Sequence, residues 1–206
     1  MNINKDTKIY GSFSNNPGNN GCIFFNNEFE NNGINAIYKS FYSTDAEKLV
    51  ESVKHLKFSG FAVSMPLKME IMKYLDHIDS AALKIGAVNT VIIEDNKLIG
   101  YNTDWIGVKK YFNYKIKNDH ITILGNGGFS KAIQYACDDL GMTYNIITRE
   151  NWNSISNLDG LIFNATPENV NVKGKLIDGR PFTNTGIIIA NLQAIEQFYL
   201  YTGIRI

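Results

Sequence analysis

Residues 120–132 read His-Ile-Thr-Ile-Leu-Gly-Asn-Gly-Gly-Phe-Ser-Lys-Ala, and this stretch decides the fold class. Its first five residues form a short apolar run typical of a strand. The run leads into a turn in which three of four residues are glycine, and helical spacing then continues to Leu140. A strand, a glycine-rich turn and a helix in this order place backbone N–H groups where they can hold a phosphate. The stretch therefore predicts a nucleotide-binding unit that uses Gly125, Asn126, Gly127 and Gly128.

The turn matches the dinucleotide fingerprint Gly-x-Gly-x-x-Gly at two of its three glycines. The first glycine permits a tight turn, the second lets the backbone approach a pyrophosphate, and the third allows the helix to pack closely. Here the third position holds Ser130, which is small but carries a side chain. An ordinary glycine-rich turn is the alternative interpretation, and the strand that follows argues against it.

That next strand, expected over Thr143–Thr148, ends beside Arg149, which lies 24 residues after Gly125. A residue at about this distance reads the ribose of a bound dinucleotide. An acidic residue would accept from the 2′-hydroxyl of NAD, whereas an arginine pairs with the 2′-phosphate of NADP. Thr148 and Arg149 therefore favour NADP(H) as the cofactor. The alternative is a solvated surface arginine, and adjacent Glu150 weakens the positive field.

The rest of this second α/β unit is short. Only 14 residues separate Arg149 from Asn164, and a crossover with a full helix needs at least about 10 to 12 before a new strand is counted. The 19 residues between Thr166 and Gly186 are polar and allow at most one weak strand. The sequence thus predicts a reduced Rossmann sheet, followed by a helix over 187–201 that returns to the first half of the chain.

The first half alternates strands and helices. Ser43-Thr44-Asp45 followed by Glu47 is the signature of a capped helix start. The segment 12–21, rich in Ser, Asn, Gly and Pro, is expected to be a loop. The other expected elements are strands at 8–11, 34–41 and 60–63, helices at 23–31, 46–56, 68–75 and 80–85, and a hairpin at 91–100.

These patterns predict an α/β protein of two domains. An N-terminal α/β domain is expected to comprise residues 1–103 together with 186–206, because the C-terminal helix returns to it. A reduced Rossmann-like nucleotide domain is expected to comprise residues 104–185.

Two charged residues lie in loops that suit a reactive side chain. Lys68 comes two residues after Pro66, whose ring fixes φ and removes a backbone donor, so we expect the lysine to project from a rigid loop or helix start. Asp104 follows the second strand of the expected hairpin. Loops held by a rigid scaffold often carry functional residues. Lys68 and Asp104 are therefore the catalytic candidates, with a simple salt bridge between loops as the alternative.

Composition argues against several classes of function. The 206 residues are 44% hydrophobic, enough for a sizeable core, and 20 basic residues balance 20 acidic ones without the stripe that would indicate nucleic acid binding. No apolar run approaches the roughly 18 residues of a membrane span, and the first six residues lack the apolar core of a secretory signal, so a cytoplasmic location is expected. Cys22 and Cys137 predict two reduced thiols and no metal site.

Six motifs in a fixed order run through both halves of the chain. They are Gly-Phe-Ala-Val-Ser-Met-Pro-Leu-Lys (60–68), Ile-Gly-Ala-Val-Asn-Thr (85–90), Gly-Tyr-Asn-Thr-Asp (100–104), Leu-Gly-Asn-Gly-Gly-Phe-Ser-Lys-Ala (124–132), Asn-Ala-Thr-Pro (164–167) and Leu-Gln-Ala (192–194). This series resembles the shikimate dehydrogenase family. The resemblance implies a substrate-binding first domain and the NADP-dependent reduction of 3-dehydroshikimate to shikimate in aromatic amino acid biosynthesis, by a monomer or homodimer.

The resemblance also implies roles for individual residues. A Lys68 ammonium beside ionised Asp104 would stabilise the alkoxide that develops on the ketone and supply its proton. The implied substrate-binding residues are Ser64, where the family more often has Thr, Asn89 and Gln193. The implied cofactor-binding residues are Asn164 and Thr166, in the turn beneath the cofactor, and Gly186 at the start of the last helix.

The chain departs from the family pattern at three places. Ser12 and Ser14 match the Ser-x-Ser pair that holds the substrate carboxylate, but the segment is longer than in the family, so Asn19 and Asn20 are alternatives. Ile188 stands where a second glycine would precede the last helix. An Asp-Met-x-x-Tyr-like block has no counterpart. These departures leave quinate or a related cyclic polyol acid as an alternative substrate, and a non-catalytic ligand-binding homologue as an alternative function.

Overall fold

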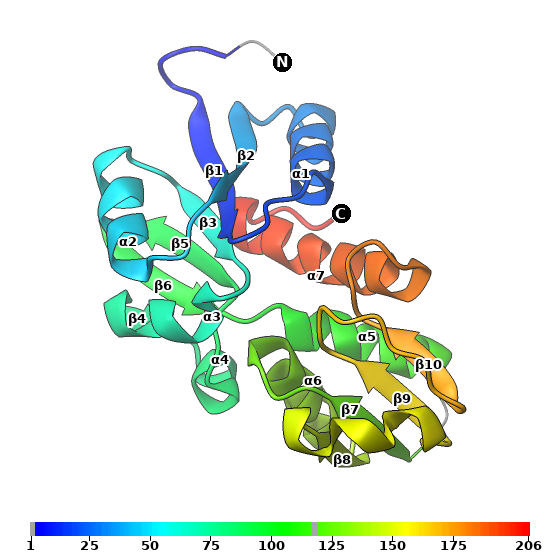
Figure 1. Ribbon diagram of the computed structural model, residues 1–206. Coiled ribbons are helices and arrows are strands. Elements are labelled where there is room, and N and C mark those ends of the chain that lie inside the picture. The colour runs from blue at the N-terminus through cyan, green and yellow to red at the C-terminus, as the bar shows by residue number, and fades with distance from the viewer. Residues whose placement is uncertain (1–2, 117–118) are drawn as a thin grey trace. The chain divides into compact units, whose positions relative to one another are not determined.

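The computed structural model describes residues 3–116 and 119–206, and its contacts divide the chain into two compact units (Figure 1). The first unit comprises the chain up to Asn102 together with Gln197–Ile206, and the second comprises Thr103–Glu196. Each unit is built around its own sheet, so the predicted α/β class is confirmed. Within the described ranges, no helix is both long and apolar enough to cross a membrane.

The sheet of the first unit has six strands in the order β2-β1-β3-β5-β6-β4. β1 lies between β2 and β3 and is parallel to both, whereas β3 and β5 are antiparallel. β5 and β6 form the predicted hairpin, and its turn residues Asp95 and Asn96 both have positive φ, as in a type I′ turn. The strands are β1 (Lys8–Ser14), β2 (Ala36–Tyr42), β3 (Gly60–Val63), β4 (His77–Ile78), β5 (Thr90–Glu94) and β6 (Lys97–Tyr101).

Helices of the first unit begin and end at residues suited to those positions. Asp45 accepts a hydrogen bond from the backbone N–H of Lys48 at 3.0 Å, which is the predicted cap of α2. Asp79 caps α4 in the same way, and Gly86 ends it in the left-handed conformation. The helices are α1 (Asn20–Asn31), α2 (Ala46–His55), α3 (Leu67–Glu70) and α4 (Ser80–Ile85), with a 3-10 helix η1 (Ile71–Tyr74) after α3.

Aromatic side chains fill much of the interior of the first unit. Tyr10 packs against Tyr201 of the C-terminal helix with ring centroids 4.7 Å apart, and its hydroxyl donates to the Tyr201 carbonyl at 3.0 Å. Gly60 allows this approach, since a Cβ there would lie 3.0 Å from the Tyr201 ring. The end of the C-terminal helix therefore packs within the first unit, as predicted. Other buried rings are those of Phe13, Phe25, Phe29, Phe58, Phe61 and Phe198.

Two features of this sheet differ from the sequence prediction. The segment from Ser12 onwards was expected to be a loop, but β1 continues to Ser14 because strands on both sides pair with it, Ser12 lying opposite Ser40 and Ala62. Strand β4 was not expected. It has two residues and pairs with β6 at the edge of the sheet.

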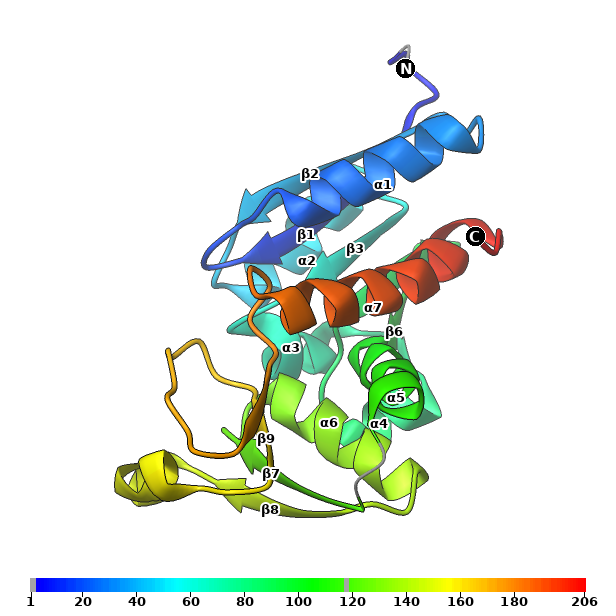
Figure 2. The ribbon, with the colours of Figure 1, turned by 90° about the vertical axis from the view of Figure 1, so that its right-hand side faces the viewer.

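The sheet of the second unit has four parallel strands in the order β10-β9-β7-β8. Figure 2 labels three of them, β9, β7 and β8. The chain passes from β7 to β8 on one side and then crosses to β9 on the other, so the carboxyl ends of β7 and β9 form a topological switch point. A 3-10 helix replaces the crossover helix before β9, which confirms the reduced sheet. The elements are α5 (Asp104–Lys115), β7 (His120–Leu124), α6 (Gly128–Asp139), β8 (Thr143–Ile147), η2 (Arg149–Asn157), β9 (Leu161–Asn164), β10 (Lys175–Asp178) and α7 (Asn184–Thr202).

Helix α7 begins in the second unit and ends in the first. Its first half packs closely on α5 because Gly107 has no side chain, and a Cβ there would lie 2.9 Å from the Ile189 carbonyl oxygen. An ion pair between Lys110 and Glu196 joins the same two helices. The unit boundary consequently falls at Gln197, eleven residues after the position 186 expected from the sequence.

Candidate functional site

The turn between β7 and α6 requires glycine at its first position. Gly125 has a φ of +104°, and a Cβ on this residue would lie 2.8 Å from the Cγ2 atom of Thr166. Its backbone N–H donates to the carbonyl of Ile147, at the end of β8, at 2.8 Å. A side chain here would strain the backbone and push the turn away from the end of β9.

Ser130 takes the place of the third glycine and ties the turn to the helix. Ser130 is fully buried, and its hydroxyl donates to the Gly125 carbonyl at 2.7 Å. Gln134, one helical turn later, donates to the same hydroxyl at 3.2 Å. The departure from the glycine pattern therefore adds hydrogen bonds that hold the turn in place.

The N-terminus of α6 is open at Gly127. A Cβ on Gly127 would meet nothing within 4 Å, and both Asn126 and Gly127 are exposed. No side chain caps the helix, and its first turn contains no acidic residue. The first backbone N–H groups of a helix have no partner within it and attract anions. The residues present here thus fit the phosphates of a nucleotide.

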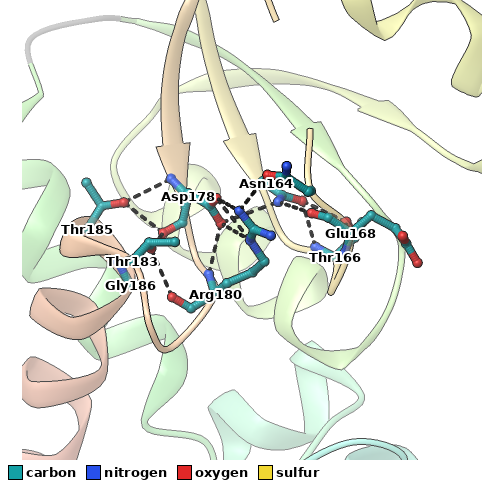
Figure 3. Close-up of polar contacts among 9 residues, drawn as sticks. Asn164, Thr166, Glu168, Asp178, Arg180, Thr183, Thr185 and Gly186 are labelled. Atoms are coloured by element: carbon teal, nitrogen blue, oxygen red, sulfur yellow. Dashed lines mark hydrogen bonds and ion pairs between the residues drawn. The ribbon is translucent and has the colours of Figure 1, made fainter. Parts of the chain in front are cut away.

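The buried side chain of Asn164, the last residue of β9, shapes the neighbouring turn (Figure 3). Its amide nitrogen donates to the Glu168 carbonyl at 2.9 Å and to Asp178 Oδ1 at 3.3 Å. Its amide oxygen accepts from the N–H and the hydroxyl of Thr166, at 3.0 and 2.7 Å. These four bonds use both donors and both acceptor positions of the amide. Because all four hydrogen-bonding positions of its amide are used, Asn164 holds Thr166 in place beside Gly125.

Asp178, the last residue of β10, forms a nearly buried ion pair with Arg180 (Figure 3). The guanidinium approaches both carboxylate oxygens, with Nη2–Oδ2 at 2.6 Å and Nε–Oδ1 at 3.0 Å. The side chains are 11% and 13% exposed, respectively. This carboxylate raises the pKa of Arg180 above its ordinary value. The pair is a bidentate clamp that fixes the loop after β10.

The same loop is tied to the start of α7. Both Thr183 and Thr185 donate their hydroxyls to the Asp178 carbonyl at 2.7 Å. Gly186 leaves no room for a side chain, because a Cβ would lie 1.8 Å from the Arg180 carbonyl oxygen. Sequence reasoning identified Gly186 but missed Asp178, Arg180 and the two threonines. The sequence feature that could have indicated this loop is Asp-Gly-Arg-Pro, which directly follows a short apolar run.

Thr148 and Arg149 lie at the end of β8, beside the turn at Gly125. Thr148 precedes η2, and its carbonyl accepts from the N–H of Asn151 at 3.1 Å. Arg149 and the adjacent Glu150 are exposed. An exposed guanidinium at this strand end has the chemistry to pair with a phosphate on the ribose.

Backbone hydrogen bonds in the first unit bring the segment of Lys68 next to that of Asn89. The Val88 N–H donates to the Lys68 carbonyl at 2.8 Å, and the Val63 N–H donates to the Asn89 carbonyl at 2.9 Å. Lys68 is half-buried in α3, and Ser64 is exposed just after β3. Three of the predicted site residues therefore lie on adjacent segments of one unit.

The buried side chain of Asn89 belongs to a short polar chain. Thr90 donates its hydroxyl to Asn89 Oδ1 at 2.8 Å, and Gln197 donates its amide to the Thr90 hydroxyl at 2.7 Å. Gln197 is 3% exposed and was not among the residues expected from the sequence. It lies one helical turn after the predicted Gln193, a spacing that places both on one face of α7.

Asp104 and Gln193 lie in the second unit. Asp104 is the first residue of α5 and is 6% exposed. Thr103, just before the helix, donates its hydroxyl to Gln193 Oε1 at 2.9 Å. The catalytic candidates are thus divided between units, with Lys68 in the first and Asp104 in the second.

The hydroxyl of Ser12 is used between strands. It donates to the Ser40 hydroxyl at 3.0 Å, and Ser40 lies 3.2 Å from the sulfur of Cys22. Ser14 is 9% exposed and ends β1. Asn19 stands at the N-cap of α1 and makes no side-chain cap bond. Ser14 therefore ends β1, and Asn19 and Asn20 begin α1, so these three residues flank the loop between the two elements, whereas Ser12 lies within the strand.

The two cysteines differ in burial, since Cys137 is buried and Cys22 is partly exposed. Burial raises the pKa of the Cys137 thiol to about 12, so the thiol stays protonated at neutral pH. In residues 3–116 and 119–206, no group of three or more His, Cys, Asp and Glu side chains is placed to hold a metal ion.

Comparison with protein families gives one match in the first unit. The family model described as the shikimate dehydrogenase substrate binding domain matches residues 21–91. The matched segment contains Ser64, Lys68 and Asn89 and ends before the second unit begins.

Comparison with individual proteins extends the similarity beyond that segment. A shikimate dehydrogenase-like protein of Haemophilus influenzae is 39% identical over 141 residues, which are 68% of this chain and 52% of that protein. A shikimate dehydrogenase (NADP(+)) of Bacillus cereus is 41% identical over 143 residues, 66% of this chain and 51% of that protein. The chain thus spans about half the length of the curated relatives it matches. The crystal structure of shikimate dehydrogenase from Aquifex aeolicus superposes with a TM-score of 0.82 at 28% identity, covering 99% of this chain and 96% of that one.

Proposed function

The chain belongs to the shikimate dehydrogenase family, and from this premise we propose that it reduces 3-dehydroshikimate to shikimate with NADPH. The observation that carries the proposal is the coexistence of two parts. One is the Ser64, Lys68 and Asn89 cluster, and the other is the open N-terminus of α6 behind Gly125. A substrate site without a nucleotide site would support binding alone.

The cofactor is assigned to the turn between β7 and α6. The pyrophosphate would lie on the backbone N–H groups beyond Gly127, where a side chain is absent. Thr166, held by Asn164, lines the next strand end. Arg149 would pair with the 2′-phosphate, which is the reason for NADP over NAD. The printed name of the Bacillus cereus relative specifies NADP(+) as well.

The chemistry is the transfer of a hydride and a proton to a ring ketone. Bound NADPH would supply the hydride. The Lys68 ammonium stabilises the negative charge that develops on the ketone oxygen and donates the proton there. Asp104, at the start of α5, is proposed as the carboxylate partner of the Lys68 ammonium. Asn89 and Gln193 serve as amide partners of the ring hydroxyls, and Ser64 adds a hydroxyl. Ser12 and Ser14 hold the carboxylate, with Asn19 and Asn20 as the alternative.

Turnover of shikimate and NADP tests the proposal directly. We expect NADPH absorbance to appear on incubation with shikimate and NADP, and Lys68→Ala to lower kcat at least about a hundredfold with a smaller change in KM. Lys84→Ala, on the exposed face of α4, is the matched control and should keep wild-type turnover. Near-normal kcat in Lys68→Ala contradicts the catalytic role.

A second candidate function is ligand binding without turnover. Two observations favour it: the reduced sheet of the second unit, and the similarity to a Haemophilus influenzae protein named only as shikimate dehydrogenase-like. Quinate or another cyclic polyol acid is the alternative substrate, because the loop before α1 is longer than the family pattern. Titration calorimetry with shikimate and quinate, alongside the turnover assay, separates the cases. Binding without turnover of either acid would replace the enzymatic proposal.

A further inference from the structure

A glutamine lies near the end of α7 at a position whose buried neighbours are apolar. Gln197 is 3% exposed, and the neighbouring buried residues of the helix are Ala194, Phe198 and Tyr201. An apolar side chain would fill this place without the cost of burying an amide. Glutamine is rarely buried to this degree unless it has hydrogen-bond partners. Packing alone therefore does not account for the residue type at position 197.

Gln197 begins a chain of hydrogen bonds that runs in one direction. Its Nε2 donates to the Thr90 hydroxyl at 2.7 Å, and Thr90 donates that hydroxyl to Asn89 Oδ1 at 2.8 Å. An amide nitrogen donates and does not accept, so the Thr90 oxygen accepts from Gln197 and the single hydroxyl hydrogen is left for Asn89. Asn89 then turns its amide oxygen, and not its nitrogen, toward Thr90.

The main chain of Asn89 is held on both sides, which leaves the side-chain amide as the group to be oriented. The Asn89 N–H donates to the Tyr101 carbonyl at 3.0 Å, and the Asn89 carbonyl accepts from the Val63 N–H at 2.9 Å. The oxygen and the nitrogen of a planar amide point in different directions. With the oxygen directed at Thr90, the N–H groups of Asn89 are directed away from Thr90.

We propose that Gln197 is a positioning residue that acts through Thr90 and makes Asn89 a hydrogen-bond donor to the substrate. The inference rests on the proposed function, in which Asn89 contacts a ring hydroxyl. In this arrangement the substrate oxygen accepts from the Asn89 amide, and its own hydrogen is directed to another partner. Gln197 itself does not touch the substrate.

Removal of the Gln197 amide reverses the preferred orientation of Asn89. Without that donor, the buried Thr90 oxygen is satisfied when Asn89 turns its N–H groups toward it, which presents the Asn89 oxygen to the substrate instead. Apparent affinity falls with the fraction of chains that hold the binding orientation. Gln197→Met, which keeps a long unbranched side chain without the amide, should therefore raise the dissociation constant for shikimate at least about fivefold.

Titration calorimetry with shikimate and the full chain measures this effect. The matched control is Tyr201→Phe, one helical turn after Gln197, which removes a buried hydroxyl outside the chain of bonds and should keep the wild-type dissociation constant. Steady-state kinetics then separates positioning from stability. We expect Gln197→Met to raise KM and to leave kcat within about twofold, whereas a purely structural role would lower the folded fraction, and so kcat, at an unchanged KM.

Substitutions of Thr90 test the same chain of bonds at its middle member. Thr90→Val keeps the shape without the hydroxyl and should weaken shikimate binding at least about fivefold, and Thr90→Ser, which keeps a hydroxyl, should recover most of that loss. Once the hydroxyl is absent, Gln197 has nothing to act on. Thr90→Val combined with Gln197→Met should therefore bind shikimate within about twofold of Thr90→Val alone.

The outcomes distinguish this inference from the proposed function. A wild-type chain that does not bind shikimate overturns the proposed function and this inference with it. Wild-type binding that Gln197→Met or Thr90→Val leaves unchanged overturns the inference alone. Fully additive losses in the double variant do the same, because they would show that Gln197 and Thr90 act independently.

Discussion

The two units hold their strand ends together by different means. In the first unit, which is built on a six-stranded sheet, the burial of apolar side chains provides most of the stabilisation. Aromatic rings such as those of Tyr10 and Tyr201 pack against one another there. In the second, connections are short, and a 3-10 helix stands where a crossover helix would cover the sheet. There the ends of β9 and β10 are joined by the side chains of Asn164, Asp178 and Arg180. Where helices are missing, polar side chains take over part of their structural role.

This difference implies that the units respond differently to substitution. An apolar interior loses stability in proportion to the surface and volume removed. A polar network fails when one member is removed, because the remaining groups are left without partners. Since local unfolding can be confined to one part of a protein, hydrogen exchange of backbone amides can measure each unit by itself.

The largest effect is expected from Asp178→Ala. This change leaves the Arg180 guanidinium without its carboxylate and Asn164 without one acceptor, so exchange of amides in β9 and β10 should accelerate about a hundredfold. Amides of β1 and β3 should exchange as in the wild type. The control is Asp159→Ala, whose side chain is 76% exposed and makes a long ion pair with Lys173. Equal acceleration in both units would show that the network is not specific to the second.

A smaller effect is expected at the glycine turn. Ser130→Ala removes the bond to the Gly125 carbonyl and should cost about 1 kcal/mol in the stability of the second unit. Ser130→Gly restores the fingerprint glycine but adds the cost of glycine in a helix, so it should lose about 2 kcal/mol in total. Urea unfolding followed by NADP titration measures both stability and affinity. A glycine variant more stable than the alanine variant would show that close packing matters more at this position than the hydroxyl.

The elements predicted correctly from the sequence are those with local causes. The turn at Asp95 and Asn96 requires positive φ, the cap at Asp45 is a side chain bonding to its own helix, and the turn at Gly125 follows a glycine pattern. The extension of β1 to Ser14 depends on strands that pair from both sides, so the polar composition of the segment was misleading.

The same distinction applies to the candidate site. Lys68, Asp104 and Asn89 could be predicted because each stands in a short motif beside a strand end, and their roles stay predictions. Asp178 and Arg180 escaped notice because their role depends on β10 lying next to β9, a pairing that composition does not reveal. The boundary at Gln197 was missed for a related reason, since α7 continues through it without a break in helical spacing.

The smallest expected change is a gain of stability in the first unit. The Tyr201 hydroxyl is buried and has no hydrogen-bond partner among the described residues. Tyr201→Phe removes this unsatisfied group and should stabilise the first unit by about 1 kcal/mol. Tyr10→Phe is the matched control, because the Tyr10 hydroxyl donates to the Tyr201 carbonyl and its removal should cost about 1 kcal/mol. Thermal unfolding of both variants compares them, and destabilisation by Tyr201→Phe would contradict the assignment.

The pH dependence of unfolding, compared between the wild type and the Tyr201→Phe variant, isolates the cause of the gain in stability. Burial raises the pKa of Tyr201 well above the ordinary value of 10.0, and the neighbouring Tyr38 and Tyr10 raise it further. Below pH 10 the phenol is neutral in the folded and unfolded chains, so it contributes no pH dependence there. Above pH 10 the unfolded chain ionises first, so the wild type loses stability that the Tyr201→Phe variant keeps. The difference in the free energy of unfolding should therefore widen between about pH 10 and about pH 11, and a constant difference would mean that Tyr201 reaches water in the folded state.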